Sequence, residues 1–351
     1  MEQVGLWWLA RMAAARNPVL EKLTFGWHNH FAASATKVRD PAAMLAQNEY
    51  LRRHALGRFG ELAHAMIVDP AMLRWLDGQK NTAKAPNENL AREFMELFAL
   101  GHDGGYTESD VREGARALTG WRIGPDFAAY LDPKRHDSGT KTVLGVTGNL
   151  DAAKFADAVL ARPASARFVV TRWWRFLAAP GVPPAPTLER LLKAYGGGRE
   201  LRPMFRALLL DPAFAQAENQ IVTGPVEWLI GAIRALRVPM TGERVKRVSS
   251  ALRSLGQAPL LPPNVGGWPS GQAWLSTAAA AGRAKFVPQL VAAGSVTPVA
   301  NAPAARRVDA AAHLLGIGSL TPATTNALSR AGGDPVKLVS TLLLSPEYLV
   351  N

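Results

Sequence analysis

Two histidines lie one residue apart in the stretch WHNHFAAS, residues 27–34. On a β-strand the side chains of His28 and His30 would share a face and could chelate one metal ion. On a helix two residues correspond to a turn of about 200°, so the rings would point in nearly opposite directions. Apolar residues at helical spacing favour the helix: Leu20, Leu23, Trp27 and Phe31. We therefore expect the imidazoles to point apart, with at most one of them serving as acid, base or metal ligand, and with packing as the alternative.

A second candidate is the helix predicted over residues 86–101, PNENLAREFMELFALG, which Pro86 and Asn87 open and Gly101 closes. Its polar side chains fall within one arc of about 140°: Glu88, Asn89, Arg92, Glu93 and Glu96. Facing water, they would form ordinary pairs such as Glu88–Arg92. Facing the interior, crowded carboxylates raise one another's pKa or bind a cation, as acid–base and carboxylate–metal sites require.

Three further patterns contain histidine. His54, in QNEYLRRHALGRF, is either a base or a packing element on a predicted helix. Glu61 and His64 form a Glu-x-x-His motif, the ligand spacing of di-iron helix bundles. Such a bundle needs a second Glu-x-x-His, and the chain has none, so a di-iron site is not favoured. His136 and Asp137 adjoin each other in a predicted turn, and loops often carry functional groups.

Composition removes several classes of function. The chain contains no cysteine, which excludes disulfides, zinc–thiolate sites and cysteine nucleophiles. The net charge of +12 is compatible with an anionic partner, but arginines are spread along the chain without a nucleic-acid-binding motif, so nucleic acid is not favoured. No secretory signal is visible, and the apolar runs are shorter than the roughly 18 residues of a membrane span, so we expect a soluble chain whose location the sequence leaves open.

These residues must be positioned mainly by helices. A cap residue followed by proline satisfies a free backbone N–H while proline loses no hydrogen bond, and it recurs at Asn17-Pro18, Asp40-Pro41, Asp69-Pro70, Asp211-Pro212, Asp334-Pro335 and Ser345-Pro346. With the apolar spacing between them, these starts predict ten or more helices. Strand signals concentrate in 127–145, where two short β-prone runs flank a turn.

The predicted fold class is therefore all-α with a small β-hairpin insertion around 127–145. We expect a single large helical domain over 1–351, or two packed halves. The half 1–150 would carry the polar residues and the hairpin, and 151–351 would be helical.

Seven stretches together resemble a known family: LEKLTFGWHNHFAAS, QNEYLRRHALGRF, DPAMLRWLDGQKNTAKAPNENLAREFMELFALG, YTESDVREGARALTGW, RHDSGTKTVLG, LPPNVGGWPSGQAWL and LLLSPEYL. They occur in the order typical of the bacterial family catalogued as domain of unknown function 1800, from about Trp7 to the C-terminus. The resemblance implies a helical protein of unassigned activity, often exported and often encoded beside a sulfatase-like companion. Family members usually carry an additional N-terminal segment with an export signal, so we expect a trimmed or shortened member.

The resemblance also implies a set of recurrent polar residues: His28, Asn29, His30, Asn48, Arg53, His54, Asn81, Asn87, Glu88, Asn89, Glu93, Glu96, His136, Asp137 and Lys141. Because buried polar groups are costly unless they are satisfied, such a set either forms a rigid network or lines a cleft.

The first hypothesis is an enzyme pocket between helices 18–33, 41–56 and 86–100, closed by the 127–145 hairpin. His28, His30 or His54 would be acid, base or metal ligand. Glu93 or Glu96 would be the carboxylate partner, and Asn87 and Asn89 would orient a polar or anionic group. Metal-assisted or carboxylate acid–base hydrolysis is the reaction class, with glycans or phosphate esters as candidate substrates and a divalent metal ion as the candidate cofactor.

The second hypothesis is a non-catalytic helical scaffold that binds a protein partner, such as the sulfatase-like companion. The polar residues would then form a structural network. Tryptophans would anchor the contact where they are exposed, and the candidates are Trp7, Trp8, Trp173, Trp174, Trp268 and Trp274. A third hypothesis, an anionic surface or nucleic acid bound through the net charge, predicts a steep salt dependence.

Overall fold

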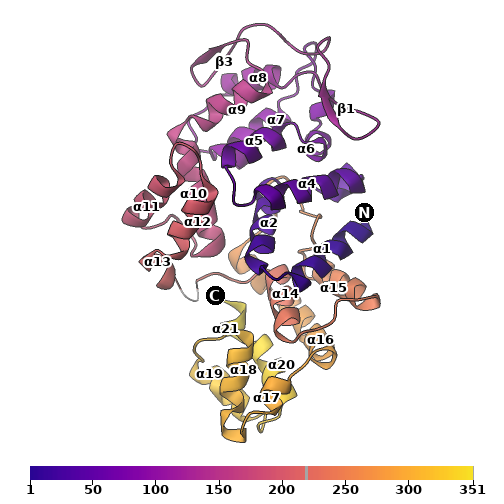
Figure 1. Ribbon diagram of the computed structural model, residues 1–351, viewed down its shortest axis with the longest axis vertical. Helices are drawn as coiled ribbons and strands as arrows, with labels where there is room; N and C mark the ends of the chain where they lie inside the picture. Colours follow the sequence, from indigo (N-terminus) through magenta and orange to yellow (C-terminus); the bar gives the residue numbers. More distant parts are fainter. Residues whose placement is uncertain (218–219, 351) are drawn as a thin grey trace. The chain divides into compact units, whose positions relative to one another are not determined.

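The structure, a computed structural model, describes residues 1–217 and 220–350. Within these residues the chain forms 21 α-helices, several shorter helical turns and two small antiparallel sheets (Figure 1). The predicted class, all-α with a small β insertion, is confirmed.

The chain divides into two compact units. Unit 1 comprises Val19–Gln216 and Leu260–Trp268. Unit 2 comprises Glu2–Pro18, Ala217–Pro259 and Pro269–Asn351. These compact units do not show whether either of them is a domain that folds alone. The predicted division into halves at residue 150 therefore stays a prediction.

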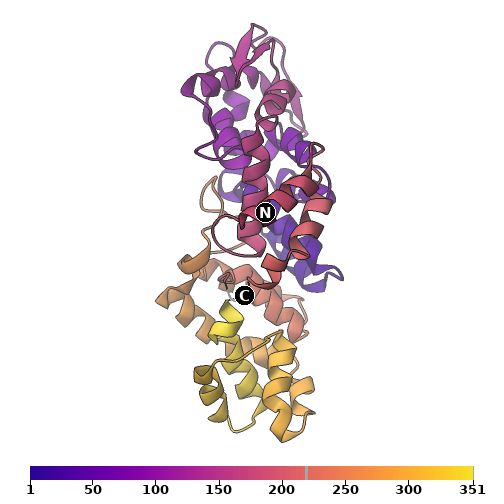
Figure 2. The ribbon, with the colours of Figure 1, turned by 90° about the vertical axis from the view of Figure 1, so that its left-hand side faces the viewer.

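Unit 1 holds most of the polar residues singled out above. Its helices are α2 (Pro18–His30), α3 (Ala35–Val38), α4 (Pro41–His54), α5 (Phe59–Ile67), α6 (Pro70–Trp75), η1 (Gly78–Lys80), α7 (Asn89–Glu93), η2 (Phe94–Ala99), α8 (Glu108–Ala117), α9 (Ala152–Leu160), α10 (Pro163–Leu177), α11 (Ala185–Tyr195), α12 (Leu201–Leu209) and α13 (Pro212–Ala215). The long helix α10 runs beside α11, which packs on α12 (Figures 1 and 2).

The core of unit 1 is built around Trp27. Its ring is fully buried and meets the ring of Trp173 edge-on at 4.6 Å. Phe59 and Phe31 stack at 5.8 Å and 6.2 Å, and the indole N–H donates to the carbonyl of Ala55 at 3.1 Å. A single side chain of α2 therefore joins α4, α5 and α10, and its polar atom is satisfied.

Helix starts follow the cap-then-proline pattern. The carboxylates of Asp40, Asp69, Asp211 and Asp334 each accept a hydrogen bond from a backbone N–H of the first helical turn. Ser345 also precedes a helix, but its side chain makes no cap hydrogen bond. The local pattern therefore predicts the helix starts even where one cap bond is missing.

The β-prone region contains two hairpins. Strand β1 (Trp121–Ile123) pairs with β2 (Ala129–Leu131), and β3 (Lys141–Val143) pairs with β4 (Val146–Gly148). The predicted hairpin in which the two runs of 127–145 pair with each other is therefore wrong in its pairing.

The physical reason is the turn at Leu144 and Gly145. Both residues have positive φ, 52° and 86°, as a two-residue hairpin turn that matches the strand twist requires. That turn pairs β3 with the residues that follow it, and the segment between β2 and β3 is left as a loop.

In its described residues, unit 2 consists of helices and loops, with one isolated β-bridge between Val222 and Val350. Its elements are α1 (Glu2–Ala14), α14 (Pro225–Ala235), α15 (Glu243–Ser254), η3 (Gly271–Leu275), α16 (Thr277–Ala293), α17 (Thr297–Ala300), η4 (Ala304–Arg306), α18 (Arg307–Leu315), α19 (Pro322–Ser329), α20 (Pro335–Leu343) and α21 (Pro346–Leu349). Helix α1 packs on α14 and α15, and α18 packs on α20. Among the described residues of both units, none of the helices combines the length and the apolar character that a membrane crossing needs.

The close packing of α2 on α10 can be tested at Gly26. A Cβ there would lie 2.6 Å from Cη2 of Trp173 and 2.9 Å from Cε1 of Phe176. We expect Gly26→Ala to lower the free energy of unfolding by about 1–3 kcal/mol, because two rigid rings would have to move. The matched control is Gly60→Ala in α5, where a Cβ meets nothing within 4 Å and the better helix propensity of alanine adds up to about 1 kcal/mol. Urea unfolding of both variants checks this; equal effects would contradict the packing.

Candidate functional site

His28 and His30 both lie on α2, and as the helical spacing predicted they contact different elements. The ring of His28 lies against that of Trp268, with 5.5 Å between ring centroids. His30 donates from Nε2 to the carbonyl of Phe98 at 2.8 Å, so Nε2 carries its proton. Burial lowers the pKa of His28 to about 3 and holds the pKa of His30 well below its usual value. Both imidazoles are therefore neutral core groups at neutral pH.

His54 lies at the end of α4, near the surface. Its ring stacks on that of Tyr50 at 4.3 Å, and Nδ1 lies 3.3 Å from a carboxylate oxygen of Glu61. In the described residues, no hydrogen bond or ion pair joins His30 or His54 to the carboxylates of residues 88–96. The three-helix pocket predicted from the sequence is thus not assembled by direct polar contacts between those groups.

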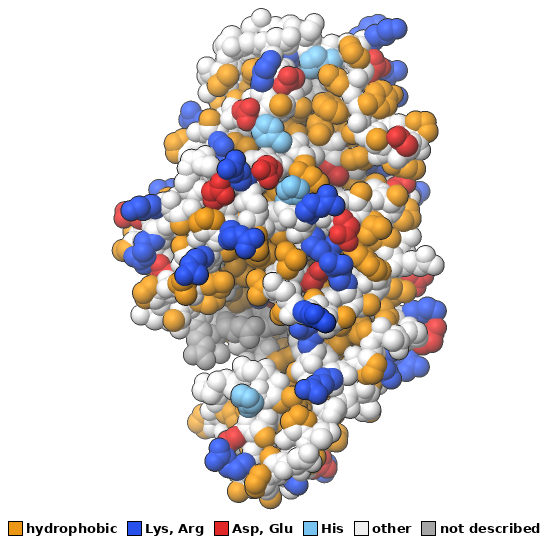
Figure 3. Space-filling view, viewed as in Figure 1, with side chains coloured by type: hydrophobic (Ala, Val, Ile, Leu, Met, Phe, Trp, Pro, Cys, Tyr) orange, Lys and Arg blue, Asp and Glu red, His pale blue; other side chains and the backbone are white. Residues whose placement is uncertain are grey.

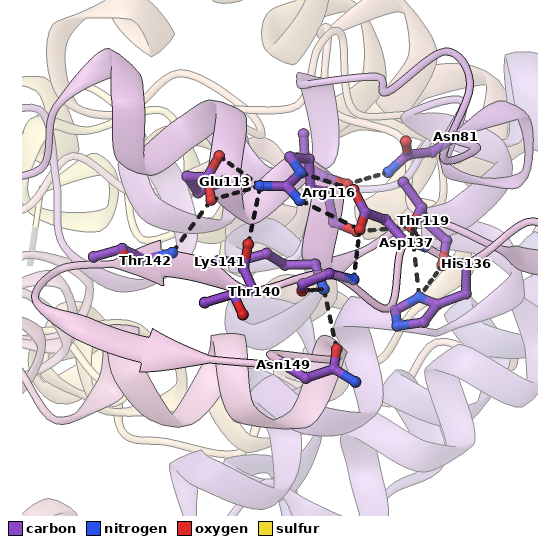
Figure 4. A network of polar contacts seen from close by, with 12 residues as sticks. Asn81, Glu113, Arg116, Thr119, His136, Asp137, Thr140, Lys141, Thr142 and Asn149 are labelled. Carbon is purple, nitrogen blue, oxygen red and sulfur yellow. Dashed lines mark hydrogen bonds and ion pairs between the residues drawn. The ribbon is translucent and has the colours of Figure 1, made fainter.

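A network of charged side chains lies where α8 meets β3 and the loop before it (Figure 4). Arg116 of α8 donates from Nε to Asp137 at 2.7 Å and from Nη1 to both carboxylate oxygens of Glu113, at 3.0 Å and 2.9 Å. The Arg116 guanidinium lowers the pKa of Asp137, and the two carboxylates raise the pKa of Arg116. Arg116 and Asp137 are therefore held in their charged forms.

Two carboxylates of α8 also bind the backbone of the β3–β4 hairpin. Asp110 accepts from the N–H of Leu144 at 2.6 Å, and Glu113 accepts from the N–H of Thr142 at 3.2 Å. Asp110 forms a capping box with Thr107 at the start of α8 as well. One face of α8 thus satisfies the free edge of β3, which would otherwise need another partner.

The loop before β3 is fixed by His136 and Lys141 (Figure 4). His136 donates from Nδ1 to the carbonyl of Thr119 at 2.9 Å. Lys141 is buried, and its Nζ donates to the carbonyl of Gly139 at 2.9 Å and to Asn149 at 3.2 Å. Burial lowers the pKa of Lys141.

Asparagines connect α8 to the start of α7. The buried side chain of Asn81 donates to the carbonyl of Ala115 at 2.8 Å and accepts from the N–H of Asn87 at 2.9 Å. Asn87 in turn accepts from the N–H of Asn89 at 3.0 Å. Asn87 and Asn89 therefore shape the entry to the acidic helix and its link to α8.

The acidic helix itself turns its polar side toward the start of α8. Arg92 binds Glu88 at 2.9 Å and Glu108 at 2.7 Å and 2.8 Å. These pairs raise the pKa of Arg92 and lower the pKa of Glu108. Glu88 and Arg92 form the ordinary surface pair that their spacing predicted.

Glu93 and Glu96 have a different environment. Both are half-buried, and Glu96 accepts from the hydroxyl of Tyr106 at 3.3 Å and lies 2.9 Å from Nδ1 of His102. Burial, together with the charge of Glu96, raises the pKa of Glu93. Burial and Glu96 also raise the pKa of Tyr106 to about 12. The acidic face expected for this helix thus contains one half-buried carboxylate pair, and an acid–base role for it stays a prediction.

The helix changes its winding at this pair. From Phe94 to Ala99 it continues as η2, a π-helical segment in which the N–H of Leu100 reaches back to the carbonyl of Met95 at 2.7 Å. Such segments are rare and often occur at functional sites.

The predicted residues therefore fall into separate groups. Asp137 binds Arg116, and His136 binds the carbonyl of Thr119. Asn87, bonded to Asn89, is joined to α8 through Asn81. Glu93 and Glu96 form the carboxylate pair. The groups that the sequence analysis missed are Arg116, Glu113, Tyr106 and His102. Glu113 and Arg116 form a local i,i+3 pair on α8, whereas the contacts of Arg116 with Asp137 and of Tyr106 and His102 with Glu96 depend on the fold. Among the described residues, no three His, Asp or Glu side chains are grouped as metal ligands.

Charged side chains of both signs cover the face seen in Figure 3. Lysines and arginines are scattered over it, with acidic side chains between them. This distribution agrees with the many ion pairs in the structure, such as Arg58 with Glu200 at 2.8 Å. The net positive charge is therefore dispersed on this face.

The family described as protein of unknown function (DUF1800) matches residues 1–350, and the chain belongs to this family. No curated protein and no solved structure matches the chain.

The contact between Arg116 and Asp137 can be tested by pH. Because the folded pKa of Asp137 is lowered, its contribution to stability is present above the ordinary aspartate pKa and is lost as pH falls through the folded value. We expect Asp137→Asn to lower the free energy of unfolding by about 1–3 kcal/mol at pH 7 and by less at pH 3, below the ordinary aspartate pKa. Urea unfolding at both pH values measures this, with Asp103→Asn on the exposed loop after η2 as the control. A loss of the same size at both pH values would contradict the ion pair.

Proposed function

We propose that this protein is a hydrolase that uses carboxylate acid–base chemistry, with Glu93 as the acid and Glu96 as the base. The observation that carries this proposal is the raised pKa of the half-buried Glu93 beside the carboxylate of Glu96. Two neighbouring carboxyl groups whose environments differ are the arrangement that assigns one group to each role.

Each residue has a defined task in this reaction. Glu93, which keeps its proton to higher pH, donates that proton to the leaving-group oxygen of the substrate. Glu96 accepts a proton from the water that attacks the substrate. Tyr106 and His102, both in contact with Glu96, fix the orientation of the base.

The substrate class follows from this chemistry. Protonation by Glu93 assists a bond whose leaving group is a poorly stabilised oxygen, as in a glycoside or a phosphate ester. Asn87 and Asn89 lie at the start of the same helix, where polar groups of a substrate would find hydrogen-bonding partners. Glycosides are the first choice, because they react with two carboxyl groups alone.

The experiment compares three glutamate variants of one helix on aryl glycosides and aryl phosphate esters. We expect Glu93→Gln and Glu96→Gln to lower kcat/KM by about 10²–10⁴-fold, because each removes a proton-transfer group. Glu88→Gln is the matched control, since among the described residues the Glu88 carboxylate pairs with Arg92 alone, and it should stay within about twofold of the wild type.

The choice of leaving group separates the two roles. A nitrophenolate leaving group needs little protonation, so it should restore part of the activity of Glu93→Gln but none of that of Glu96→Gln. Thermal melts show whether the variants are folded. Wild-type protein without turnover on any of these substrates, or folded variants with wild-type rates, would contradict the proposal.

A second candidate function is a non-catalytic scaffold for a sulfatase-like companion. The network at α8 favours it, because Arg116, Asp137 and Glu113 satisfy one another as structural groups do. The proposed tryptophan anchors do not support it, since five of the six are buried: Trp8, Trp173, Trp174, Trp268 and Trp274. Co-purification with the companion, unchanged in Glu93→Gln and Glu96→Gln, would favour this candidate.

A further inference from the structure

Arg283 places a guanidinium group in the interior of unit 2. It lies on α16 and is 1% exposed. Its guanidinium carbon stands 5.7 Å from the ring centre of Trp228 of α14, and Nη1 donates to the carbonyl of Trp274 at 2.9 Å. Trp228 is itself fixed by an indole hydrogen bond to the carbonyl of Leu343 at 2.9 Å. The position of the guanidinium is therefore set by α14, α16, α20 and η3.

The remaining donors of Arg283 are not satisfied within the described residues. Its Nε and Nη2 are buried and have no hydrogen-bond partner there. Burial lowers the pKa of Arg283, and no carboxylate of the described residues opposes that effect. A buried cation without a counter-charge is one of the costliest groups that a protein interior can hold.

Unit 1 shows how the same chain satisfies a buried arginine. Arg52, 4% exposed, uses Nε and Nη2 to bind both carboxylate oxygens of Glu21, at 2.7 Å and 3.0 Å. These are the two nitrogens that lack a partner in Arg283. They form one edge of a planar group and match two oxygens of a carboxylate.

We propose that the Nε–Nη2 edge of Arg283 is a binding site for a small carboxylate anion, of the size of formate or acetate. The anion would accept one hydrogen bond from Nε and one from Nη2, and its negative charge would neutralise the guanidinium. Arg283 would then have the same partner chemistry that Glu21 provides for Arg52. Trp228 and the carbonyl of Trp274 hold the guanidinium so that this edge is preformed. Because the guanidinium is enclosed, the anion is small and enters through local opening of unit 2.

The test is a thermal melt of the full chain in sodium formate, at constant ionic strength with sodium gluconate as the balancing salt. A ligand that binds only the folded state raises Tm logarithmically with its concentration above Kd, by roughly 2 °C at about ten times its Kd for a chain of this length. We expect this rise for the wild type and its loss in Arg283→Met. Arg253→Met, which removes an exposed arginine of α15, is the matched control and should keep the rise.

Direct binding is measured by the line width of ¹³C-formate. The signal should broaden with wild-type protein, sharpen again when acetate is added, and broaden at least tenfold less with Arg283→Lys, which keeps the charge but loses the two-donor edge. If Arg283→Met does not fold, this comparison of the wild type with Arg283→Lys tests formate binding in its place. A formate signal that stays sharp with the wild type, or a Tm rise of the same size in Arg283→Met, would overturn the proposal.

Discussion

The docking of the β3–β4 hairpin on α8 is the constraint on which the polar region of unit 1 depends. Asp110 and Glu113 accept backbone N–H groups from the hairpin, and Arg116 binds Asp137 in the loop before it. All three are charge-assisted hydrogen bonds, and those of Asp110 and Asp137 are partly buried, which makes these two stronger than ordinary surface pairs. The other end of the same helix contributes Glu108, which binds Arg92. Because both ends of α8 are fixed, the position of the acidic helix is fixed as well.

Burial decides which of the polar residues remain available for chemistry. His28 and His30 have the residue types of a catalytic or metal site, but the core of unit 1 keeps them neutral. Glu93 and Glu96 lie at the margin of that core, where desolvation is only partial and a proton can still exchange with water. The proposed reaction therefore belongs to the carboxylate pair, and His30 of α2 binds the carbonyl of Phe98 in η2, the segment that carries Glu96.

The sequence was informative where structure is local. Cap residues such as Asp40 and Asp69 predicted helix starts, and the spacing of His28 and His30 predicted rings that point apart. The acidic face of residues 88–96 was also visible as a pattern. The partner of Asp137 was not, because Arg116 is 21 residues away and meets it only after the hairpin has docked. The hairpin pairing was missed because a turn at two positive-φ residues, one of them Leu144, has no clear signal in residue type.

The most direct measurement of the central claim is the titration of the Glu93 carboxyl group by ¹³C NMR, with its signal assigned by its loss in Glu93→Gln. The account predicts a pKa above the ordinary glutamate value of about 4.3, and a fall of that pKa when Glu96 is replaced by glutamine, because one of its two causes is removed. A Glu93 that titrates at the ordinary value, and equally in both proteins, would contradict the account.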